Sequence, residues 1–511
     1  MAMATVLSRA QHGMDAPQVR VEVDISSGLP AFAIVGLPEA VVKESRDRVR
    51  AAIVNCNFEM PAGRITVNLS PADLPKEGGR FDLPIALGIL LASGQLPGAS
   101  FEGCEFYGEL SLSGELRPVK GALLAALAAS RADNKLVVPV ANADEAMLVT
   151  KCLIAAASHL LEVAAHLTQT TPLTFRRGEP RSPMVTNAPD LCEVRGQAQA
   201  RRALEIAAAG QHSLLLVGPP GTGKSMLAQR LPGLLPPMTE SEALEVAAVR
   251  SVCGGTIRPD EWRVRPFRNP HHTASAIALV GGGAVPRPGE ISLAHNGVLF
   301  LDELPEFGRR VLEVLREPLE NGVIVISRAA RQMEFPARFQ LIAAMNPCPC
   351  GYLGDSPGRC RCSMEKIDHY RARISGPLLD RLDMHVEVPR MPASALHPRA
   401  EDESSEVVAS RVRCARQRQL ARQGCANATL TNREIHEHCR MAPDARKMLE
   451  RATTSLGLSA RAHHRILKVA RTIADLAAEE AIGAAQISEA IALRKLDRSR
   501  SNGGGIAPPP G

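Results

Sequence analysis

The spacing of apolar and polar positions changes several times along the chain, and each change marks a new kind of element. In the first third, Val19–Gly28 and Ile65–Pro71 alternate apolar and polar residues, which predicts strands with one buried face. Lys43–Asn55 carries apolar residues at helical spacing. Strands mixed with helices in this way predict one α+β domain.

Three later runs, Ser213–Val217, Gly297–Leu304 and Leu341–Met345, contain the short apolar stretches typical of buried strands. Beyond Pro389 the chain becomes helical and polar. We therefore expect an N-terminal domain (1–172), a linker rich in Pro and Arg (173–190), a large domain (191–390), a helical lid (391–498) and a disordered tail (499–511).

The segment His212–Ser225, HSLLLVGPPGTGKS, predicts a phosphate-binding loop between a strand and a helix that begins at Lys224. Glycine is needed because a side chain would keep the backbone N–H groups away from the anion. Lys224 is expected to reach the β- and γ-phosphates, and Ser225 is expected to hold Mg²⁺. The residues expected to bind the nucleotide are Gly218, Pro219, Pro220, Gly221, Thr222, Gly223, Lys224 and Ser225.

Three polar positions beside predicted strands complete this candidate ATP site. Asp302 is expected to hold Mg²⁺ through water, and Glu303 to deprotonate the attacking water. Asn346 follows the third apolar run, and its spacing is compatible both with holding that water and with an Asn-Pro turn. Arg381 is compatible with a structural ion pair or with an arginine finger that acts on a neighbouring subunit, which requires a ring.

Composition limits the possible partners. The 511 residues carry a net charge of only +6, so affinity for nucleic acid must come from local basic surfaces. Aromatic residues make up 3 % of the chain, which disfavours a protein that stacks bases. No apolar run approaches the roughly 20 residues of a membrane span, and no signal-peptide pattern is present, so we expect a cytoplasmic protein without a membrane partner.

Two basic segments are candidate DNA contacts. Val252–Gly289 is an insertion rich in Gly, Pro and Arg, for which a solvated surface is the alternative. Asn321–Pro336 predicts a hairpin with a basic tip that would project into the pore of a ring. Such arginines are expected to grip phosphates rather than read bases. The candidates are Arg265 and Arg268 in the insertion, and Arg328 and Arg331 in the hairpin.

Four of the twelve cysteines form two C-x-C pairs separated by nine residues. They are Cys348, Cys350, Cys360 and Cys362. Four thiolates suit a tetrahedral, structural Zn²⁺ that would hold the loop after Asn346. The spacing is tighter than that of the usual knuckle, and reduced thiols without metal are the alternative. His271 and His272 lack a paired ligand and are expected to be structural.

Four stretches together resemble the YifB/ComM family of AAA+ ATPases, also called magnesium-chelatase-like. The stretches are Phe267–Gly283, Pro286–Phe307, Asn346–Asp355 and Ser459–Leu476. The resemblance implies an α/β fold: a P-loop AAA+ module with a parallel sheet flanked by helices and a small helical lid. It makes Asn346 sensor 1, Arg381 the trans-acting finger and Arg461 sensor 2. It also implies a homo-hexameric ring, and in ComM-type members a DNA branch-migration motor in recombination and natural transformation.

The N-terminal domain resembles the proteolytic domain of Lon-type proteases through the run GELSLSGELRPV within Phe106–Gly121, which predicts a hairpin with its turn near Gly114. Lon-like proteases need a Ser and a Lys, at positions that correspond approximately to Arg80 and Leu123 here. We therefore expect a Lon-like α+β scaffold without protease activity.

The expected function is that of an ATP- and Mg²⁺-dependent ring motor, a helicase or branch-migration enzyme, on single-stranded or branched DNA. One alternative is the ATPase subunit of a metal-chelatase-type or protein-remodelling complex. Another is a binding protein that uses ATP only as a switch. Stimulation of ATP turnover by DNA would separate the motor from the switch.

Overall fold

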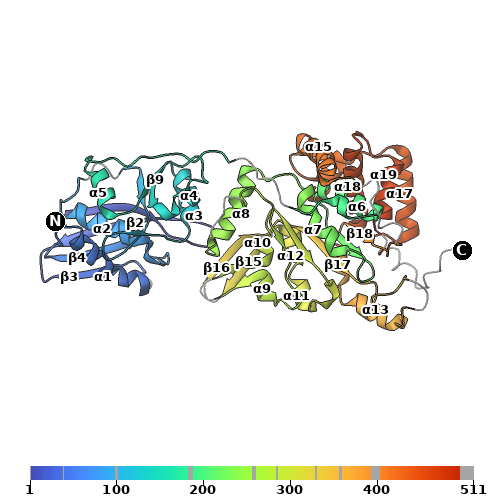
Figure 1. Ribbon diagram of the computed structural model, residues 1–511, viewed down its shortest axis with the longest axis horizontal. Coiled ribbons are helices and arrows are strands. Elements are labelled where there is room, and N and C mark those ends of the chain that lie inside the picture. The colour runs from blue at the N-terminus through green and yellow to red at the C-terminus, as the bar shows by residue number, and fades with distance from the viewer. Residues whose placement is uncertain are drawn as a thin grey trace.

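The computed structural model is elongated, with the N-terminal domain at one end, the phosphate-loop domain in the middle and the helical lid at the other end (Figure 1). The structure describes residues 2–37, 40–97, 102–181, 188–255, 261–283, 286–328, 331–355, 359–392, 403–494 and 496. Within these ranges, no helix has both the length and the apolar character needed to cross a membrane. The expected tail, 499–511, lies outside them.

The N-terminal domain is built on a mixed sheet. Its order is β3 (Ala31–Val35), β4 (Arg64–Ser70), β2 (Gln18–Ser26), β1 (Ala2–Arg9), β5 (Cys104–Phe106), β8 (Lys135–Pro139) and β9 (Ile154–Ala157). Its helices are α1 (Ala40–Asn55), α2 (Asp82–Ala92), α3 (Ala122–Arg131), α4 (Val140–Ala146) and α5 (Leu160–Leu167). The structure confirms the strands and the helix predicted from the N-terminal pattern.

The predicted hairpin of this domain is also confirmed, with β6 (Glu109–Leu110) antiparallel to β7 (Leu116–Arg117) and Gly114 at a φ of 95°. The residues at the two positions that a protease would need are both buried: Arg80 donates to the Tyr107 hydroxyl at 2.7 Å, and Leu123 lies in the core. Neither side chain can act as a serine nucleophile or a lysine base. The Lon likeness itself stays a prediction.

The phosphate-loop domain has a five-stranded sheet in which every pair of neighbours is parallel. The order is β11 (Phe267–Arg268), β14 (Val298–Leu301), β17 (Gln340–Met345), β10 (Leu214–Val217) and β18 (Met384–Glu387). Leu214 and Leu216 pack into one apolar cluster, and Leu215 and Val217 pack into another on the opposite face. This double burial explains why β10 is apolar at successive positions, and it confirms the predicted α/β fold.

Helices cover this sheet and form its insertions. They are α6 (Ala198–Gly210), α7 (Lys224–Leu234), α8 (Glu240–Val252), α9 (Ala276–Val280), α10 (Glu290–Leu293), α11 (Arg309–Glu313), α12 (Arg316–Asn321), α13 (Met364–Ala372) and α14 (Gly376–Leu379). Two antiparallel pairs join them: β12 (Gly281–Gly282) with β13 (Arg287–Pro288), and β15 (Val323–Arg328) with β16 (Arg331–Pro336). The second pair confirms the predicted basic hairpin.

The lid consists of α15 (Ser405–Gln423), α16 (Asn432–His438), α17 (Pro443–Leu456), α18 (Ala460–Leu476) and α19 (Ala484–Ala492). Helices α15 and α18 pack against α6, and residues of both domains share one apolar cluster. Arg416 donates to the carbonyl oxygen of Ala209 at 2.9 Å, and a ring nitrogen of His212 lies 2.7 Å from the Thr472 hydroxyl. The lid is therefore joined to the elements that lead into the phosphate loop.

The N-terminal domain docks on the phosphate-loop domain through α3 and α8, which share an apolar cluster. Polar contacts border this cluster, since Ser251 donates to Glu145 at 2.6 Å and Thr150 donates to Glu240 at 2.8 Å. The two domains thus meet on the helix that leads into the insertion.

Candidate nucleotide-binding site

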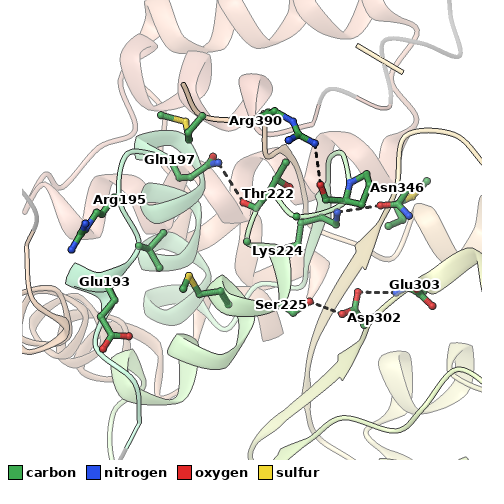
Figure 2. A pocket seen from close by; sticks show the side chains of 17 residues that line it. Glu193, Arg195, Gln197, Thr222, Lys224, Ser225, Asp302, Glu303, Asn346 and Arg390 are labelled. Atoms are coloured by element: carbon green, nitrogen blue, oxygen red, sulfur yellow. Dashed lines mark hydrogen bonds between the residues drawn. The ribbon is translucent and has the colours of Figure 1, made fainter. Parts of the chain in front are cut away.

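A cavity of about 970 Å³ opens at the carboxyl ends of the parallel strands, beside the N-terminus of α7 (Figure 2). Parallel sheets commonly bind ligands at this edge, and a helix N-terminus there favours an anion. The lining residues are Glu193, Val194, Arg195, Gln197, Pro220, Gly221, Thr222, Gly223, Lys224, Ser225, Met226, Asp302, Glu303, Met345, Asn346, Arg390 and Met391.

The loop before α7 needs its glycines. Gly221 and Gly223 have φ values of 75° and 86°, in the left-handed region where a Cβ is unfavourable. A Cβ on Gly218 would collide with the carbonyl oxygen of Val388 on the neighbouring segment. The loop can therefore curve tightly and present its backbone to a phosphate.

Lys224 places its ammonium group inside the cavity. Its Nζ donates to the carbonyl oxygens of Gly218 and Pro219 at 2.7 and 2.8 Å and to Asn346 Oδ1 at 3.2 Å. Burial lowers the pKa of Lys224, and the carboxylates of Asp302 and Glu303 oppose that shift. The contact with Asn346 brings this amide into the site, as the sensor interpretation requires.

The Ser225 hydroxyl donates to Asp302 Oδ2 at 2.5 Å, which joins the phosphate loop to the end of β14. Figure 2 shows the Asp302 side chain directed toward Ser225. A hydroxyl and a carboxylate beside a phosphate site are the oxygen donors that Mg²⁺ prefers. The residues present therefore fit the cation that ATP brings with it.

Glu303 is directed away from Lys224 and Ser225 (Figure 2). Its backbone N–H donates to Asp302 Oδ1 at 2.9 Å, and its carboxylate lies 3.2 Å from Nδ1 of His272 in the insertion. No pattern in the sequence indicates this contact, because the two residues belong to separate motifs. Among the residues that the structure describes, His272 is the one residue of the insertion whose side-chain nitrogen lies close to the predicted catalytic carboxylate.

Two arginines of the predicted site lie elsewhere. Arg381 is buried, pairs with Glu320 and donates to the Pro377 carbonyl oxygen at 2.8 Å. Arg461 is exposed near the start of α18. Neither lines the cavity of its own chain. A role for Arg461 at the nucleotide therefore stays a prediction, whereas for Arg381 the structure displays the ion-pair alternative.

The arginines predicted to contact DNA differ in burial and in their hydrogen-bond partners. Arg265 is buried, and its guanidinium is satisfied there: it donates to the Pro236 and Asn296 carbonyl oxygens at 2.7 Å and pairs with Glu242. This contradicts a role in gripping DNA.

Arg268 is held by two 2.7 Å hydrogen bonds to Glu290, which raise the pKa of the arginine despite its partial burial. The structure therefore shows it inside an intramolecular pair. The backbones of Arg328 and Arg331 pair at the end of the hairpin, and their side chains lie outside the described residues. Arg268, whose side chain is 40% exposed, and the hairpin pair therefore stay candidates for contacting DNA.

Several lining residues were not anticipated. Gln197 precedes α6 and donates to the carbonyl oxygen of Pro389 at 2.7 Å. Arg390 follows β18 and donates to the carbonyl oxygen of Pro220 at 3.5 Å. Once β18 is known to lie parallel to β10, the segment after it must adjoin the phosphate loop. The strand order, rather than any local motif, would have indicated these residues.

The four clustered cysteines also come together, with their sulfur atoms all within 4.8 Å of one another. They follow Asn346 closely in sequence and thus lie next to the nucleotide cavity.

Comparison with known proteins agrees with this geometry. The family model of magnesium chelatase, subunit ChlI, matches residues 190–396. Models of subunit ChlI of Mg-chelatase and of the ChlI C-terminal region match residues 21–142 and 402–494.

Relatives extend the match to nearly the whole chain. Competence protein ComM of Haemophilus influenzae is 50% identical over 512 residues, and the alignment covers 98% of each chain. YifB of Escherichia coli is 50% identical, with the same coverage of both chains. The magnesium-chelatase 38 kDa subunit of Cereibacter sphaeroides is 28% identical over 30% of this chain and 51% of its own. The chain belongs to the YifB/ComM family of magnesium-chelatase-like AAA+ ATPases.

Proposed function

We propose that this ATPase is a DNA motor that works as a homo-oligomeric ring, with a hexamer as the expected form. The observation that carries the proposal is the cavity in which Lys224, Ser225, Asp302, Glu303 and Asn346 converge while Arg381 stays outside. A finger arginine that does not line its own chain's cavity suits a ring, in which it would serve the next subunit.

The residues divide the chemistry between them. The loop N–H groups and Lys224 bind the phosphates, with the ammonium group leaving the Gly218 and Pro219 carbonyl oxygens for the anion. Ser225 and Asp302 would hold Mg²⁺, which neutralises developing charge on the phosphates. Glu303 would accept the proton of the water that attacks the γ-phosphorus as the bond to the β,γ-bridging oxygen breaks. Asn346 would orient that water.

The DNA part of the proposal is supported by the name of a relative and by one structural element. A protein that is 50% identical across the chain is named a competence protein, which suits a role in taking up or recombining DNA. The hairpin β15–β16 carries Arg328 and Arg331 where it turns. In a ring, this hairpin would grip the phosphates of single-stranded or branched DNA during helicase or branch-migration activity.

A second candidate function is that of a motor subunit in a metal-chelatase-type complex. The magnesium-chelatase subunit that is 28% identical over part of the chain favours it. That likeness covers 30% of this chain, whereas the match to ComM covers 98%. We therefore prefer DNA as the substrate.

The deciding experiment is steady-state ATP hydrolysis without DNA, and with single-stranded DNA, duplex and a four-way junction, at two salt concentrations. We expect stimulation to be greatest with the junction and to fade with salt, because phosphate contacts release counterions. Glu303→Gln, which should bind ATP without hydrolysing it, measures the background. Hydrolysis that is indifferent to every DNA would contradict the motor and favour the second candidate.

A further inference from the structure

Four sulfur atoms beside the nucleotide cavity have the spacing of a metal site. The Sγ atom of Cys348 lies 3.4 Å from that of Cys350 and 3.7 Å from that of Cys360, and the last two are 3.6 Å apart. Zinc–sulfur bonds of about 2.3 Å in a tetrahedron place sulfur atoms about 3.8 Å apart. A disulfide would need about 2.05 Å, and all four cysteines are free.

Two separate segments supply the sulfurs. Cys348 and Cys350 stand in the turn after β17, where the N–H of Gly351 bonds to the Cys348 carbonyl oxygen at 3.0 Å. Cys360 and Cys362 precede α13. Cys348 is fully buried, whereas Cys350 is exposed, so a metal ion could reach the cluster from solvent. Among the described residues, these are the only four metal-ligating side chains that converge in this way.

We infer that these four cysteines bind one Zn²⁺ as a structural tetrathiolate centre, and that the centre fixes one wall of the nucleotide cavity. Four protein ligands leave no position for a substrate, so the ion is not catalytic. The second half of the inference rests on the proposed role of the cavity in binding ATP.

Three contacts connect the cysteine loop to the phosphate loop. Asn346, which contacts Lys224, lies two residues before Cys348. Gly351 lies so close to the phosphate loop that a Cβ on it would be 2.7 Å from Pro220 Cδ.

The third contact runs through Asp355 of the same loop. Asp355 pairs with Arg390 at 3.3 Å, and Arg390 donates to the carbonyl oxygen of Pro220. A zinc ion that holds the cysteine loop would therefore hold Asn346, Pro220 and Arg390 in place for the nucleotide.

Metal analysis of the reduced full-length chain, purified without chelator, tests the site. We expect one zinc per chain in the native protein and in the control Cys414→Ser, whose exposed cysteine lies on α15 outside the cluster. The double variant with Cys350→Ser and Cys360→Ser should contain far less than one zinc per chain. Cobalt(II) added to zinc-extracted protein should give the absorption of tetrahedral thiolate coordination. Native protein with neither zinc nor this cobalt spectrum would overturn the site.

Binding of a non-hydrolysable ATP analogue tests the connection. Zinc extraction should weaken binding several-fold, and added zinc should restore it. Zinc that is present but whose removal leaves nucleotide affinity unchanged would overturn the connection. Lys224→Ala should lose nucleotide affinity while keeping its zinc, so failure of the ATP site and failure of the zinc site give different results. Loss of the metal can unfold a zinc-bound segment. The zinc content of the untreated native protein therefore decides, without any variant, whether the cysteines bind zinc.

Discussion

The backbone at Glu303 determines where the predicted catalytic carboxylate points. Its φ is 53°, a left-handed conformation that costs a non-glycine residue about 1 kcal/mol or more. The bond from its N–H to Asp302 supports this conformation, and His272 holds the carboxylate at 3.2 Å. We expect Glu303 to turn away from His272 when it accepts a proton from water at the γ-phosphate, because in the structure one of its oxygens faces the histidine.

His272→Ala should therefore speed ATP hydrolysis in the absence of DNA. The pair is partly exposed, and such pairs are worth up to about 1 kcal/mol, which corresponds to a basal rate up to about fivefold higher. Steady-state assays of the native protein and of the variant, both without DNA, measure this difference.

The neighbouring residue provides a matched control for this prediction. A ring nitrogen of His271 lies 2.8 Å from the Thr273 hydroxyl, and in the part of the chain that the structure describes it has no such contact with Glu303. His271→Ala should leave the basal rate unchanged. A basal rate that falls in His272→Ala would mean that the histidine positions Glu303 for catalysis instead of restraining it.

At the scale of elements, Asp383 joins the start of β10 to the lid. Its carboxylate accepts from the backbone and hydroxyl of Ser213 at 2.9 and 3.0 Å and pairs with Arg465 of α18. Burial alone would raise the pKa of Asp383, but the charge of Arg465 and the contacts with His212 and Ser213 outweigh it. The pKa is therefore held well below its usual range.

Asp383→Asn should thus destabilise the protein at neutral pH by about 3–5 kcal/mol, because it leaves Arg465 without its charged partner. The folded-state pKa is lower than the unfolded value of about 3.9, so the stabilisation is present above about pH 4 and is lost as the pH falls toward the folded-state pKa.

Thermal unfolding at pH 7 and pH 3 measures this effect. The gap in melting temperature between native protein and Asp383→Asn should be wide at pH 7 and narrower at pH 3. Glu406→Gln, which removes an exposed ion pair with Arg413, should have the melting temperature of the native protein at both pH values. An equal gap at the two pH values would show that the carboxylate charge is not the source of the stability.

Helices, strands and loops were predictable wherever a pattern among neighbouring residues determines them. The alternation in β2, the apolar run of β10 and the glycines before α7 each follow from neighbouring residues, and all three have the expected form. The Lys224, Ser225 and Asp302 group followed from two such motifs together. Arg265 was misjudged because its partner Glu242 lies on another element and its burial depends on the packing of α8.

The cavity residues contributed by strand order were missed for a similar reason. Gln197 and Arg390 meet only because β18 pairs with β10, and no spacing in the sequence encodes that pairing. Contacts between distant segments also produce the Glu303 and His272 pair. Sequence patterns thus predicted whether a segment forms a helix, a strand or a loop. Tertiary packing, in contrast, decided which polar side chains line the cavity and which pair with residues of other segments.

At the scale of the assembly, Arg381 carries a prediction about the ring. Arg381→Ala should lose most ATP hydrolysis, and mixing it with Lys224→Ala should restore part of the activity. The restoration is expected because a mixed ring contains boundaries with an intact loop on one side and an intact arginine on the other. Hydrolysis is measured in equimolar mixtures and in each variant alone.

Glu320→Gln separates the two roles of Arg381. It removes the partner of Arg381 and leaves the arginine in place. If the ion pair alone mattered, Glu320→Gln would lose activity as fully as Arg381→Ala, and mixtures would show no recovery. That pair of results would rule out the trans-acting finger.

The contact between the N-terminal domain and α8 joins one end of the molecule to its middle domain (Figure 1). Ala247 is 2% exposed within the apolar cluster that α8 shares with α3. Ala247→Asp would bury a carboxylate there without a partner, at a cost of at least about 1–3 kcal/mol, which favours the undocked form by about fivefold or more. Each domain keeps a separate core, so both domains should stay folded while the linker at 173–190 becomes easier to cleave.

Limited proteolysis measures the cleavage of the linker, and circular dichroism measures whether the domains stay folded. Ser241→Asp, at an exposed position of the same helix, is the control. Unchanged cleavage would mean that the polar contacts of Ser251 and Thr150 suffice to hold the domains together.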